Sequence, residues 1–370
     1  MNVVQIPFVD LGRQFRAIEA DLTELFLRVG RSGGYVLGET LEQFEEAAAA
    51  RCGVAYGLGV GNGTDAAVLV MRALGIGPGD EVITAANSFI ASAGAIAQVG
   101  ATPRFADVLP DLNLDPAAVE AAITPKTVAI LPVHLTGRPA PMNEINAVAE
   151  KHGLAVIEDA AQAFGAKYHD RPAGSLGLAG AFSLHPLKNL NVMGDGGLIT
   201  TNDRALYEAM HRLRNHGLVD RNTCTAWGVN SRLDALQAAI AQYKLTHIDA
   251  WNARFREIAR IYSEGLSDVV ETPIDKPHEF AVYHNYVIYT ESRDALISFL
   301  AERGVETKIH YPVLLHLQPA ASNLGYKAGD FPVAERLVDR MMSLPIYPEL
   351  EMHEIDHVVR SVRSFRDMGA

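Results

Sequence analysis

The sequence predicts an α/β domain with a mainly parallel, mixed sheet flanked by helices, followed by a smaller C-terminal α+β domain. From about residue 39 to residue 215, short apolar segments alternate with amphipathic segments long enough for helices, a pattern typical of a parallel sheet covered by helices. The connecting turns are rich in Gly, Pro and Asp, as in "GIGPGDE" at residues 75–81. After about residue 230 this alternation ends and a different pattern follows.

The elements of the first domain can be taken in order along the chain. Residues 39–52 carry an amphipathic helical pattern, and residues 55–60 form the first apolar strand. Further helices are expected at residues 64–75, 88–100, 116–123 and 142–153. Further strands are expected at residues 80–86, 102–108, 127–135, 154–161, 180–186 and 197–203.

The second domain begins with a long helical pattern. Apolar residues recur at steps of three and four from Leu233 to Tyr262, which predicts one long amphipathic helix. The strand and helix patterns that follow lie at residues 285–292, 294–304, 306–311 and 331–342. We therefore predict a large domain over residues 1–245, which includes an N-terminal helical segment, and a small domain over residues 246–370.

The composition narrows the class of protein. The 370-residue chain has a net charge of −12 and no Lys/Arg-rich run, which disfavours a nucleic-acid partner. It has no run of about 18 apolar residues, and Asp10 and Arg13 lie where a signal peptide would be apolar. We therefore expect a soluble, cytoplasmic protein with no membrane contact. Cys52 and Cys224 lack metal-ligand spacing, so we expect them to pack in the core and expect no metal site.

A glycine-rich turn precedes the helix expected at residues 64–75. Gly63 and Thr64 would offer free backbone N–H groups and a hydroxyl at a helix N-terminus, which suits a phosphate. Gly59 and Gly61 resemble the start of a dinucleotide fingerprint, but Thr64 stands where that fingerprint needs its third glycine. A plain strand–turn–helix with a capping threonine explains the same residues equally well.

An acidic residue lies at the end of the strand expected at residues 154–161. Asp159 occupies the carboxyl end of this apolar segment, where α/β sheets place ligand-binding groups. A buried carboxylate is costly unless a cation or hydrogen-bond donors meet it. Glu158 alternates to the other face and is the more ordinary of the two residues. Asp159 is therefore either a ligand-binding group or the N-cap of a helix.

A single lysine, Lys188, lies between the strand "AFSLH" and the turn "GDGG". Taken alone, it is either a solvated surface residue or a nucleophile, because a lysine amine attacks carbonyl groups once its charge is removed. Pyridoxal 5′-phosphate (PLP) needs such an amine, an acid opposite its ring nitrogen and a phosphate site. Lys188, Asp159 and the turn at residues 63–64 supply these three groups. Ser183 adds a hydroxyl on the phosphate side.

These motifs, in this order, resemble the DegT/DnrJ/EryC1/StrS family of sugar aminotransferases. The resemblance covers nearly the whole chain and rests on "GYVLGETLEQFEEAAA", "GNGTDA", "IEDAAQAFGA", "SLHPLKNLNVMGDGG" and "GVNSRLDALQAAI". A small departure is "HPLKNL", where many relatives have "HPTKNL". The resemblance implies the fold-type I architecture of PLP-dependent transferases and a homodimer whose active site is shared between subunits.

The resemblance also implies roles for individual residues. Lys188 is expected to bond to C4′ of PLP, and Asp159 to pair with the pyridinium nitrogen. Gln162 is expected to contact the phenolic oxygen of the ring. Phe89 is expected to stack on the ring face, although an ordinary core position would also suit it. The residues expected around the phosphate are Gly63, Thr64, Ser183 and, from the neighbouring subunit, Asn230.

The reaction implied by the resemblance moves an amino group from glutamate, or glutamine, to a keto sugar linked to dTDP or UDP, giving an amino sugar for glycan or secondary-metabolite biosynthesis. The "NGTDA" turn is more similar to members acting at C-3 of the sugar than to "SGTAA" members acting at C-4, so a 3-keto hexose is expected. A 4-keto sugar, an inosose, dehydration of a sugar and a non-catalytic regulatory role remain open.

The residues expected to face the sugar nucleotide are His185, Arg214, His310, Tyr311, His316 and Gln318. Arg214 would meet the diphosphate, since a guanidinium binds phosphate oxygens in pairs, but solvation at the surface explains it equally well. For the others, packing at a domain junction is the alternative.

Overall fold

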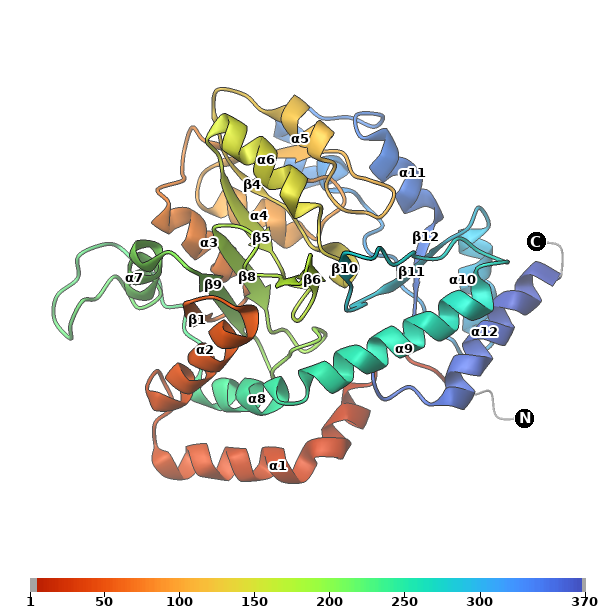
Figure 1. Ribbon diagram of the computed structural model, residues 1–370, viewed down its shortest axis with the longest axis horizontal. Coiled ribbons are helices and arrows are strands. Elements are labelled where there is room, and N and C mark those ends of the chain that lie inside the picture. The colour runs from red at the N-terminus through yellow and green to blue at the C-terminus, as the bar shows by residue number, and fades with distance from the viewer. Residues whose placement is uncertain (1–4, 368–370) are drawn as a thin grey trace.

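The computed structural model describes residues 5–367, and its centre is a seven-stranded sheet (Figure 1). The strand order is β1-β9-β8-β5-β4-β2-β3, and β9 alone in this sheet is antiparallel to both of its neighbours. The strands are β1 (Tyr56–Val60), β2 (Glu81–Ala85), β3 (Thr102–Ala106), β4 (Thr127–Leu131), β5 (Ala155–Asp159), β8 (Ala179–Ser183) and β9 (Gly197–Thr201). The prediction of a mainly parallel, mixed sheet is confirmed.

Helices cover both faces of this sheet. Alternate residues of one strand enter different cores: Ala181 of β8 faces α3, α4 and α7, whereas Phe182 faces α2 and α8. This burial on both faces explains why the strands are almost continuously apolar. The helices are α2 (Glu39–Cys52), α3 (Gly63–Ala73), α4 (Ile90–Gln98), α5 (Pro116–Ala122), α6 (Met142–His152), α7 (Arg204–Leu213) and α8 (Ala235–Leu245).

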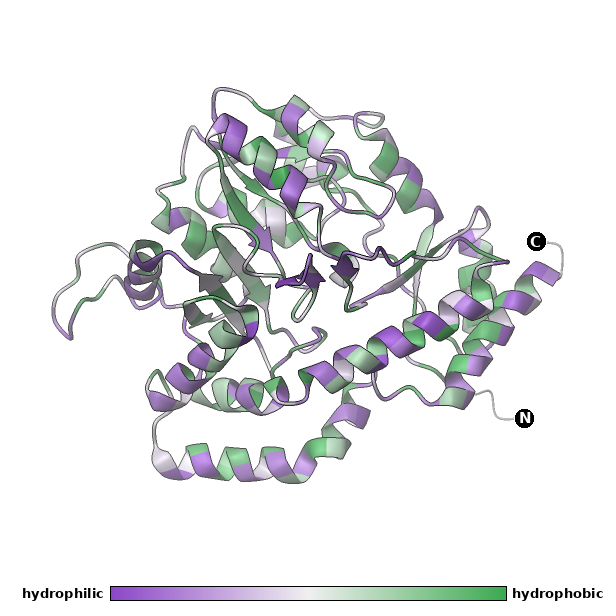
Figure 2. Cartoon of the chain, viewed as in Figure 1, coloured by the Kyte–Doolittle hydropathy of each residue, from purple (hydrophilic) through white to green (hydrophobic). Residues whose placement is uncertain are grey.

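The long helix expected from Leu233 to Tyr262 is two helices, so that prediction was wrong. Helix α8 ends at Leu245 and α9 runs from Ile248 to Leu266. Between them, the backbone N–H groups of Thr246 and His247 bond to carbonyls three residues back, which tightens the turn. Figure 2 shows apolar and polar residues alternating along both helices, so the apolar period continues across the bend without interruption.

The C-terminal part has its own apolar core, formed by α9, β11, α10, β12 and α12. Segment 314–341, however, packs with the core of the large sheet. The division into domains at residue 245 stays a prediction. The elements of the C-terminal part are β10 (Glu279–Phe280), β11 (Tyr286–Tyr289), α10 (Arg293–Glu302), α11 (Pro332–Arg340), β12 (Met341–Leu344) and α12 (Met352–Asp367).

The remaining elements lie at the periphery or in connections. Helix α1 (Leu11–Ser32) packs along α8, as Figure 1 shows below the main body. Two-residue strands and short 3₁₀ turns complete the chain: β6 (Lys167–Tyr168), β7 (Arg171–Pro172), η1 (Leu135–Gly137), η2 (Leu315–Leu317) and η3 (Pro319–Leu324). None of the helices within residues 5–367 is long and apolar enough to cross a membrane.

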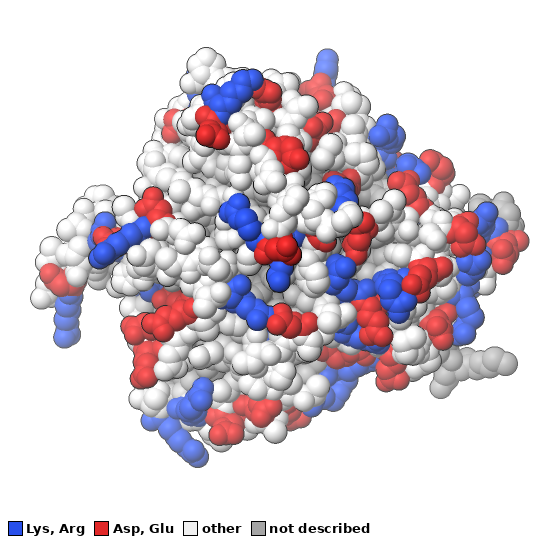
Figure 3. Space-filling view, viewed as in Figure 1, with Lys and Arg blue, Asp and Glu red and all other residues white. Residues whose placement is uncertain are grey.

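The two cysteines have different surroundings. Cys52 is buried at the end of α2, as expected, whereas Cys224 is exposed on the segment after α7, so the core position predicted for it was wrong. Charged side chains of both signs are intermixed over the face of the molecule shown in Figure 3.

Candidate active site

The carboxyl ends of β5 and β8 bring two of the predicted site residues onto neighbouring strands. Asp159 ends β5 and lies opposite Ala181 of β8, two residues before Ser183. Helix α3 begins directly against this edge, because a Cβ added to Gly63 would lie 2.7 Å from the Cβ of Ser183. The N-terminus of α3 and the Ser183 hydroxyl therefore lie together, as a phosphate site requires.

Thr64 is not the N-cap of α3. The N-cap is Asn62, whose Oδ1 accepts a 2.8 Å hydrogen bond from the N–H of Asp65. The capping-threonine alternative was therefore wrong. Thr64 is half-buried in the first turn of the helix, next to Gly63.

Asp159 is held by donors that sequence reasoning missed. Its Oδ2 accepts a 2.7 Å hydrogen bond from the Ser92 hydroxyl in α4, and its Oδ1 accepts a 3.2 Å bond from the N–H of Ala161. Ser92 in turn shares a 2.8 Å hydrogen bond with Ser88. No helix begins at Asp159, so the helix N-cap alternative was wrong. Nothing in the sequence singled out Ser92, which is one of many serines beside small residues.

Lys188 is half-buried in the turn after β8, near enough to Asp159 for the two charges to interact. Desolvation by burial lowers the pKa of Lys188 to about 8, and the nearby Asp159 carboxylate partly opposes this shift. The turn is held by hydrogen bonds from Lys188 N–H to the His185 carbonyl (2.8 Å) and from Asn191 Nδ2 to the Lys188 carbonyl (2.8 Å). A lysine with this pKa has a substantial neutral fraction near neutral pH, so it is available as a nucleophile and a base.

Three further predicted residues form a contact chain at the same edge. Gln162 is buried; its Oε1 accepts a 2.6 Å hydrogen bond from Thr136 N–H, and its Nε2 donates a 3.2 Å bond to the Tyr311 hydroxyl. The Tyr311 ring lies 5.2 Å from the Phe89 ring. Phe89 is 47% exposed. The alternative interpretation of Phe89 as an ordinary core residue was therefore wrong. Its exposed surface is available to contact a ligand.

A cluster of histidines surrounds Lys188. Burial lowers the pKa of His310 to about 4, with Lys188 adding to the shift, and His310 Nδ1 lies 2.9 Å from the Ser343 hydroxyl. Burial, followed by the charges of Lys188 and its neighbours, also holds the pKa of His284 well below its usual value. His185 is exposed beside them. The sequence offered no signal for His284, because its segment folds into place only through tertiary contacts.

Two residues expected to bind substrate make buried contacts with other parts of the protein instead. The Arg214 side chain is buried, pairs with Glu45 and donates a 2.8 Å hydrogen bond to the Gly59 carbonyl. Both the diphosphate role and the surface alternative were therefore wrong for Arg214. The His316 side chain is buried against Phe331 and lies 3.1 Å from Glu335, so it is a packing residue at the domain junction.

The last two predicted residues lie at the margin of the site. Gln318 donates a 3.1 Å hydrogen bond to the Val313 carbonyl within its own loop. Asn230 is exposed and bridges Asn215 at the base of the segment between α7 and α8. The neighbouring Ser231 bonds to Gly61 N–H (3.0 Å) and to Asp65, just before and within the first turn of α3.

Glu158 and His134 form a buried structural pair behind the site. Glu158 lies 2.9 Å from His134 Nε2 and accepts hydrogen bonds from the N–H groups of Gly174, Leu176 and Gly177. These contacts fix the loop between β7 and β8. The sequence-based view of Glu158 as the more ordinary of the two acids agrees with this arrangement.

A comparison with protein families settles which class this site belongs to. The profile of the DegT/DnrJ/EryC1/StrS aminotransferase family matches residues 16–363. The chain belongs to this family. In agreement with the match, Lys188, Asp159 and the start of α3 lie at one edge of the sheet, as the family resemblance implies.

Curated relatives of this aminotransferase-family chain carry different names. It is 44% identical to the "pleiotropic regulatory protein" of Geobacillus stearothermophilus, covering 98% of this chain and 99% of the relative. It is 42% identical to the dTDP-3-amino-3,4,6-trideoxy-α-D-glucose transaminase of Streptomyces venezuelae, covering 98% and 97%.

Solved structures agree with the family fold. DesV of S. venezuelae, in complex with a ketimine intermediate, has a TM-score of 0.95 and 42% identity, with 98% of each chain covered. A Bacillus subtilis structure with its bound cofactor PMP has a TM-score of 0.92 and 30% identity, covering 98% of this chain and 86% of that one. The fold-type I architecture and the PLP cofactor expected from the sequence are confirmed.

The residues present fit this cofactor. The absence of a Cβ on Gly63 leaves the start of α3 against Ser183, where N–H groups of a helix terminus can meet a phosphate. Asp159, held by Ser92, offers a fixed carboxylate for a ring nitrogen, and Lys188 offers an amine with a lowered pKa. Phe89 leaves an exposed ring beside Tyr311.

Proposed function

We propose that this protein is a PLP-dependent aminotransferase that moves the amino group of glutamate, or glutamine, to a 3-keto hexose linked to dTDP or UDP. The observation that carries the proposal is the arrangement of Lys188 near an anchored Asp159, one strand away from the junction of Ser183 and the N-terminus of α3. The named activities of relatives such as the S. venezuelae transaminase support the substrate class.

When bound, PLP supplies an electrophilic carbon and a ring that accepts electrons from the substrate's Cα–H bond. Asp159 would hold a proton on the ring nitrogen, and Ser92 keeps its carboxylate oriented. The Lys188 amine, with its pKa lowered to about 8, takes and returns the substrate proton near neutral pH. Helix α3 and Ser183 would bind the phosphate, and Gln162 would bind the phenolic oxygen.

The substrate face of the site is formed by residues on the exposed side of Lys188. His185 is exposed, His310 is half-buried close to the Lys188 amine, and the Tyr311 hydroxyl accepts a hydrogen bond from Gln162. Because the pKa of His310 is about 4, its ring is neutral at physiological pH and can serve as a hydrogen-bond partner for sugar hydroxyls. We propose these three side chains as the sugar-binding group.

We also propose a homodimer with a shared site. The segment between α7 and α8 projects from the body of the molecule (Figure 1), and its Trp227 is 92% exposed. Phe89 and Leu187 at the site are about half exposed, so large apolar side chains lie uncovered around the cofactor edge. A second copy that covers these side chains would place Asn230 beside the phosphate of the neighbouring cofactor.

The cytoplasmic location expected from the sequence stays a prediction.

Two measurements test the activity. Purified protein loaded with PLP should release one 2-oxoglutarate per subunit from glutamate alone, because the first half of the reaction needs no acceptor. Mass spectrometry should then detect the amino sugar when 3-keto sugar nucleotides linked to UDP or dTDP are added. Absence of 2-oxoglutarate from the glutamate reaction and of 2-oxoglutaramate from the glutamine reaction, with PLP bound, would overturn aminotransfer.

A mixed dimer tests the shared site. One chain carries Lys188→Ala and the other Asn230→Ala. If Asn230 acts on the partner's cofactor, the mixed dimer has one intact site and about half of the wild-type activity. If Asn230 acts within its own chain, no intact site remains and activity stays at the level of the variants alone.

A regulatory role is the second candidate, because one relative is named a pleiotropic regulatory protein. A regulator that only binds PLP does not need a lysine base with a lowered pKa, and Lys188 has one. The 2-oxoglutarate measurement separates the two, since a non-catalytic PLP-binding protein releases none.

A further inference from the structure

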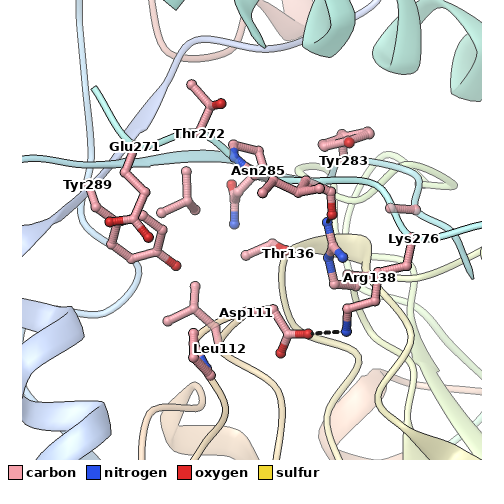
Figure 4. Close-up of a pocket in the computed structure, with 15 residues that line it drawn as sticks. Asp111, Leu112, Thr136, Arg138, Glu271, Thr272, Lys276, Tyr283, Asn285 and Tyr289 are labelled. Atoms are coloured by element: carbon pink, nitrogen blue, oxygen red, sulfur yellow. Dashed lines mark hydrogen bonds and ion pairs between the residues drawn. The ribbon is translucent and has the colours of Figure 1, made fainter. Parts of the chain in front are cut away.

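A second cavity of about 300 Å³ lies apart from Lys188, between the large sheet and the small domain. Figure 4 shows its lining side chains, which come from the loop after β3, from η1, and from segments 271–276 and 281–289. Its volume is at the lower end of the range for small-molecule sites. None of the roles derived above uses it.

One segment, residues 283–287, separates the two sites. Residues Tyr283, Asn285 and Val287 line the second cavity, whereas His284 between them faces the Lys188 side. The cavity also reaches Thr136, whose N–H bonds to the Gln162 side chain in the cofactor site. The second cavity is therefore a neighbour of the active site across a single layer of backbone.

A polar side chain without a partner marks the cavity as a binding site. Asn285 is 3% exposed, and its Nδ2 has no hydrogen-bond partner among residues 5–367. Its side chain points into the cavity in Figure 4. An unpaired buried donor destabilises the fold, so a ligand oxygen that accepts from Asn285 would remove this cost.

The charges around the cavity are paired with one another. Lys276 Nζ lies 2.7 Å from Asp111 and 3.2 Å from Glu279, and Glu279 lies 2.8 Å from Arg138. This alternating chain leaves no net charge for a charged ligand. Among the described residues, the Glu271 carboxylate has a single ion-pair partner, Arg340 at 3.4 Å, and it is available to accept a hydrogen bond.

The walls are mostly apolar. Tyr289 and Tyr283 present rings, and Leu112, Ile274 and Val287 add aliphatic surface. The Tyr289 hydroxyl points into the cavity in Figure 4. Flat apolar walls with a carboxylate acceptor and an amide donor match a ring that is apolar on its face and hydroxylated on its edge.

We propose that this cavity binds an uncharged hexose, with Asn285 donating to a ring hydroxyl and Glu271 accepting from one. This site goes beyond the catalytic proposal, since it uses none of the cofactor residues and its occupancy is measured without an amino donor.

The test uses the PLP-loaded protein and D-glucose, D-galactose and D-glucosamine as probes. Isothermal titration or ligand-observed NMR should show saturable binding of a neutral hexose. Glu271→Gln should weaken this binding at least fivefold, and Asn285→Leu should abolish it. Glu291→Gln is the matched control, because Glu291 pairs with the same Arg340 but does not line the cavity. Its binding should equal that of the wild type.

Three results would overturn the proposal. The first is the absence of saturable binding of either neutral hexose. The second is binding that Glu271→Gln leaves unchanged, which keeps the test valid even if Asn285→Leu fails to fold. The third is a preference for glucosamine, which would show that the cavity selects a cation. The 2-oxoglutarate measurement is independent, so failure of either proposal leaves the other intact.

Discussion

The Ser92 hydroxyl donates a 2.7 Å hydrogen bond to Oδ2 of Asp159, and so a helix on one side of the sheet holds the acid at the end of β5. Without this donor, the carboxylate would be fixed only by the N–H of Ala161 at 3.2 Å. The contact links the position of α4, whose N-cap is Phe89, to the orientation of the acid. Four predictions follow from this and related contacts.

Replacing Ser92 with Ala should weaken PLP binding about tenfold. A hydrogen bond to a charged group contributes roughly 1.5–3 kcal/mol, and about 1.4 kcal/mol corresponds to a factor of ten. Titration of the apoprotein with PLP measures the effect. Ser88→Ala is the control, because Ser88 contacts Ser92 but not Asp159, and its affinity should change less. Equal effects of both substitutions would contradict this role for Ser92.

Gly63→Ala should lower both the stability and the cofactor affinity of the protein. The added Cβ would lie 2.7 Å from the Ser183 Cβ, so α3 or β8 must shift, at a cost of roughly 1–3 kcal/mol. Thermal unfolding and PLP titration measure the two effects. Gly94→Ala in α4 is the control, since a Cβ there meets nothing within 4 Å and alanine favours the helix by roughly 0.5–1 kcal/mol. Unchanged PLP affinity in Gly63→Ala would refute the proposal that the N-terminus of α3 and Ser183 bind the phosphate.

The rate at which apoprotein captures PLP should rise with pH and level off near pH 8. Below its pKa of about 8, Lys188 is mostly protonated, and its neutral fraction grows tenfold per pH unit. The rate for free Nα-acetyl-lysine, divided by the neutral fraction of its own amine, gives the contribution of PLP ionisation, and division of the apoprotein rate by this value removes that contribution. Asp159→Asn should move the midpoint to lower pH, because the carboxylate raises the pKa of Lys188. A midpoint above pH 10 would show an ordinary, solvated lysine.

Arg214→Met should destabilise the fold by roughly 3–5 kcal/mol, since it leaves the buried Glu45 carboxylate without its cation. The loss should be smaller at pH 5 than at pH 8. Burial raises the pKa of Glu45, and without Arg214 the carboxyl takes up a proton more readily as the pH falls. Chemical denaturation at the two pH values measures this.

The double variant Glu45→Gln with Arg214→Met is the control for the buried pair. It should recover much of the stability, because the remaining amide can still accept from the Gly59 N–H. Full PLP affinity in these variants would confirm that Arg214 serves the fold, whereas a loss confined to substrate binding would restore its predicted role at the diphosphate.

Much of the fold could be predicted from local pattern. Strands buried on both faces are apolar along their length, and helices repeat near 3.6 residues, so both periods are visible in the sequence. The bend at Thr246 and His247 was missed because the apolar period crosses it without interruption. The packing of segment 314–341 against the large sheet also could not be predicted from local pattern, since this core is formed by residues far apart in the chain.

The sequence by itself determined the chemistry: the presence of Lys188 and Asp159 at strand ends and of a glycine at the start of α3, in the order typical of one family. Only the tertiary structure decided which other residues reach them. In the folded chain, Ser92 bonds to Asp159, and His284 lies on the Lys188 side. Arg214 and His316 instead form buried pairs with other residues. The physical reason is that a motif encodes local geometry, whereas the partner of a buried polar group is chosen by packing between elements distant in sequence.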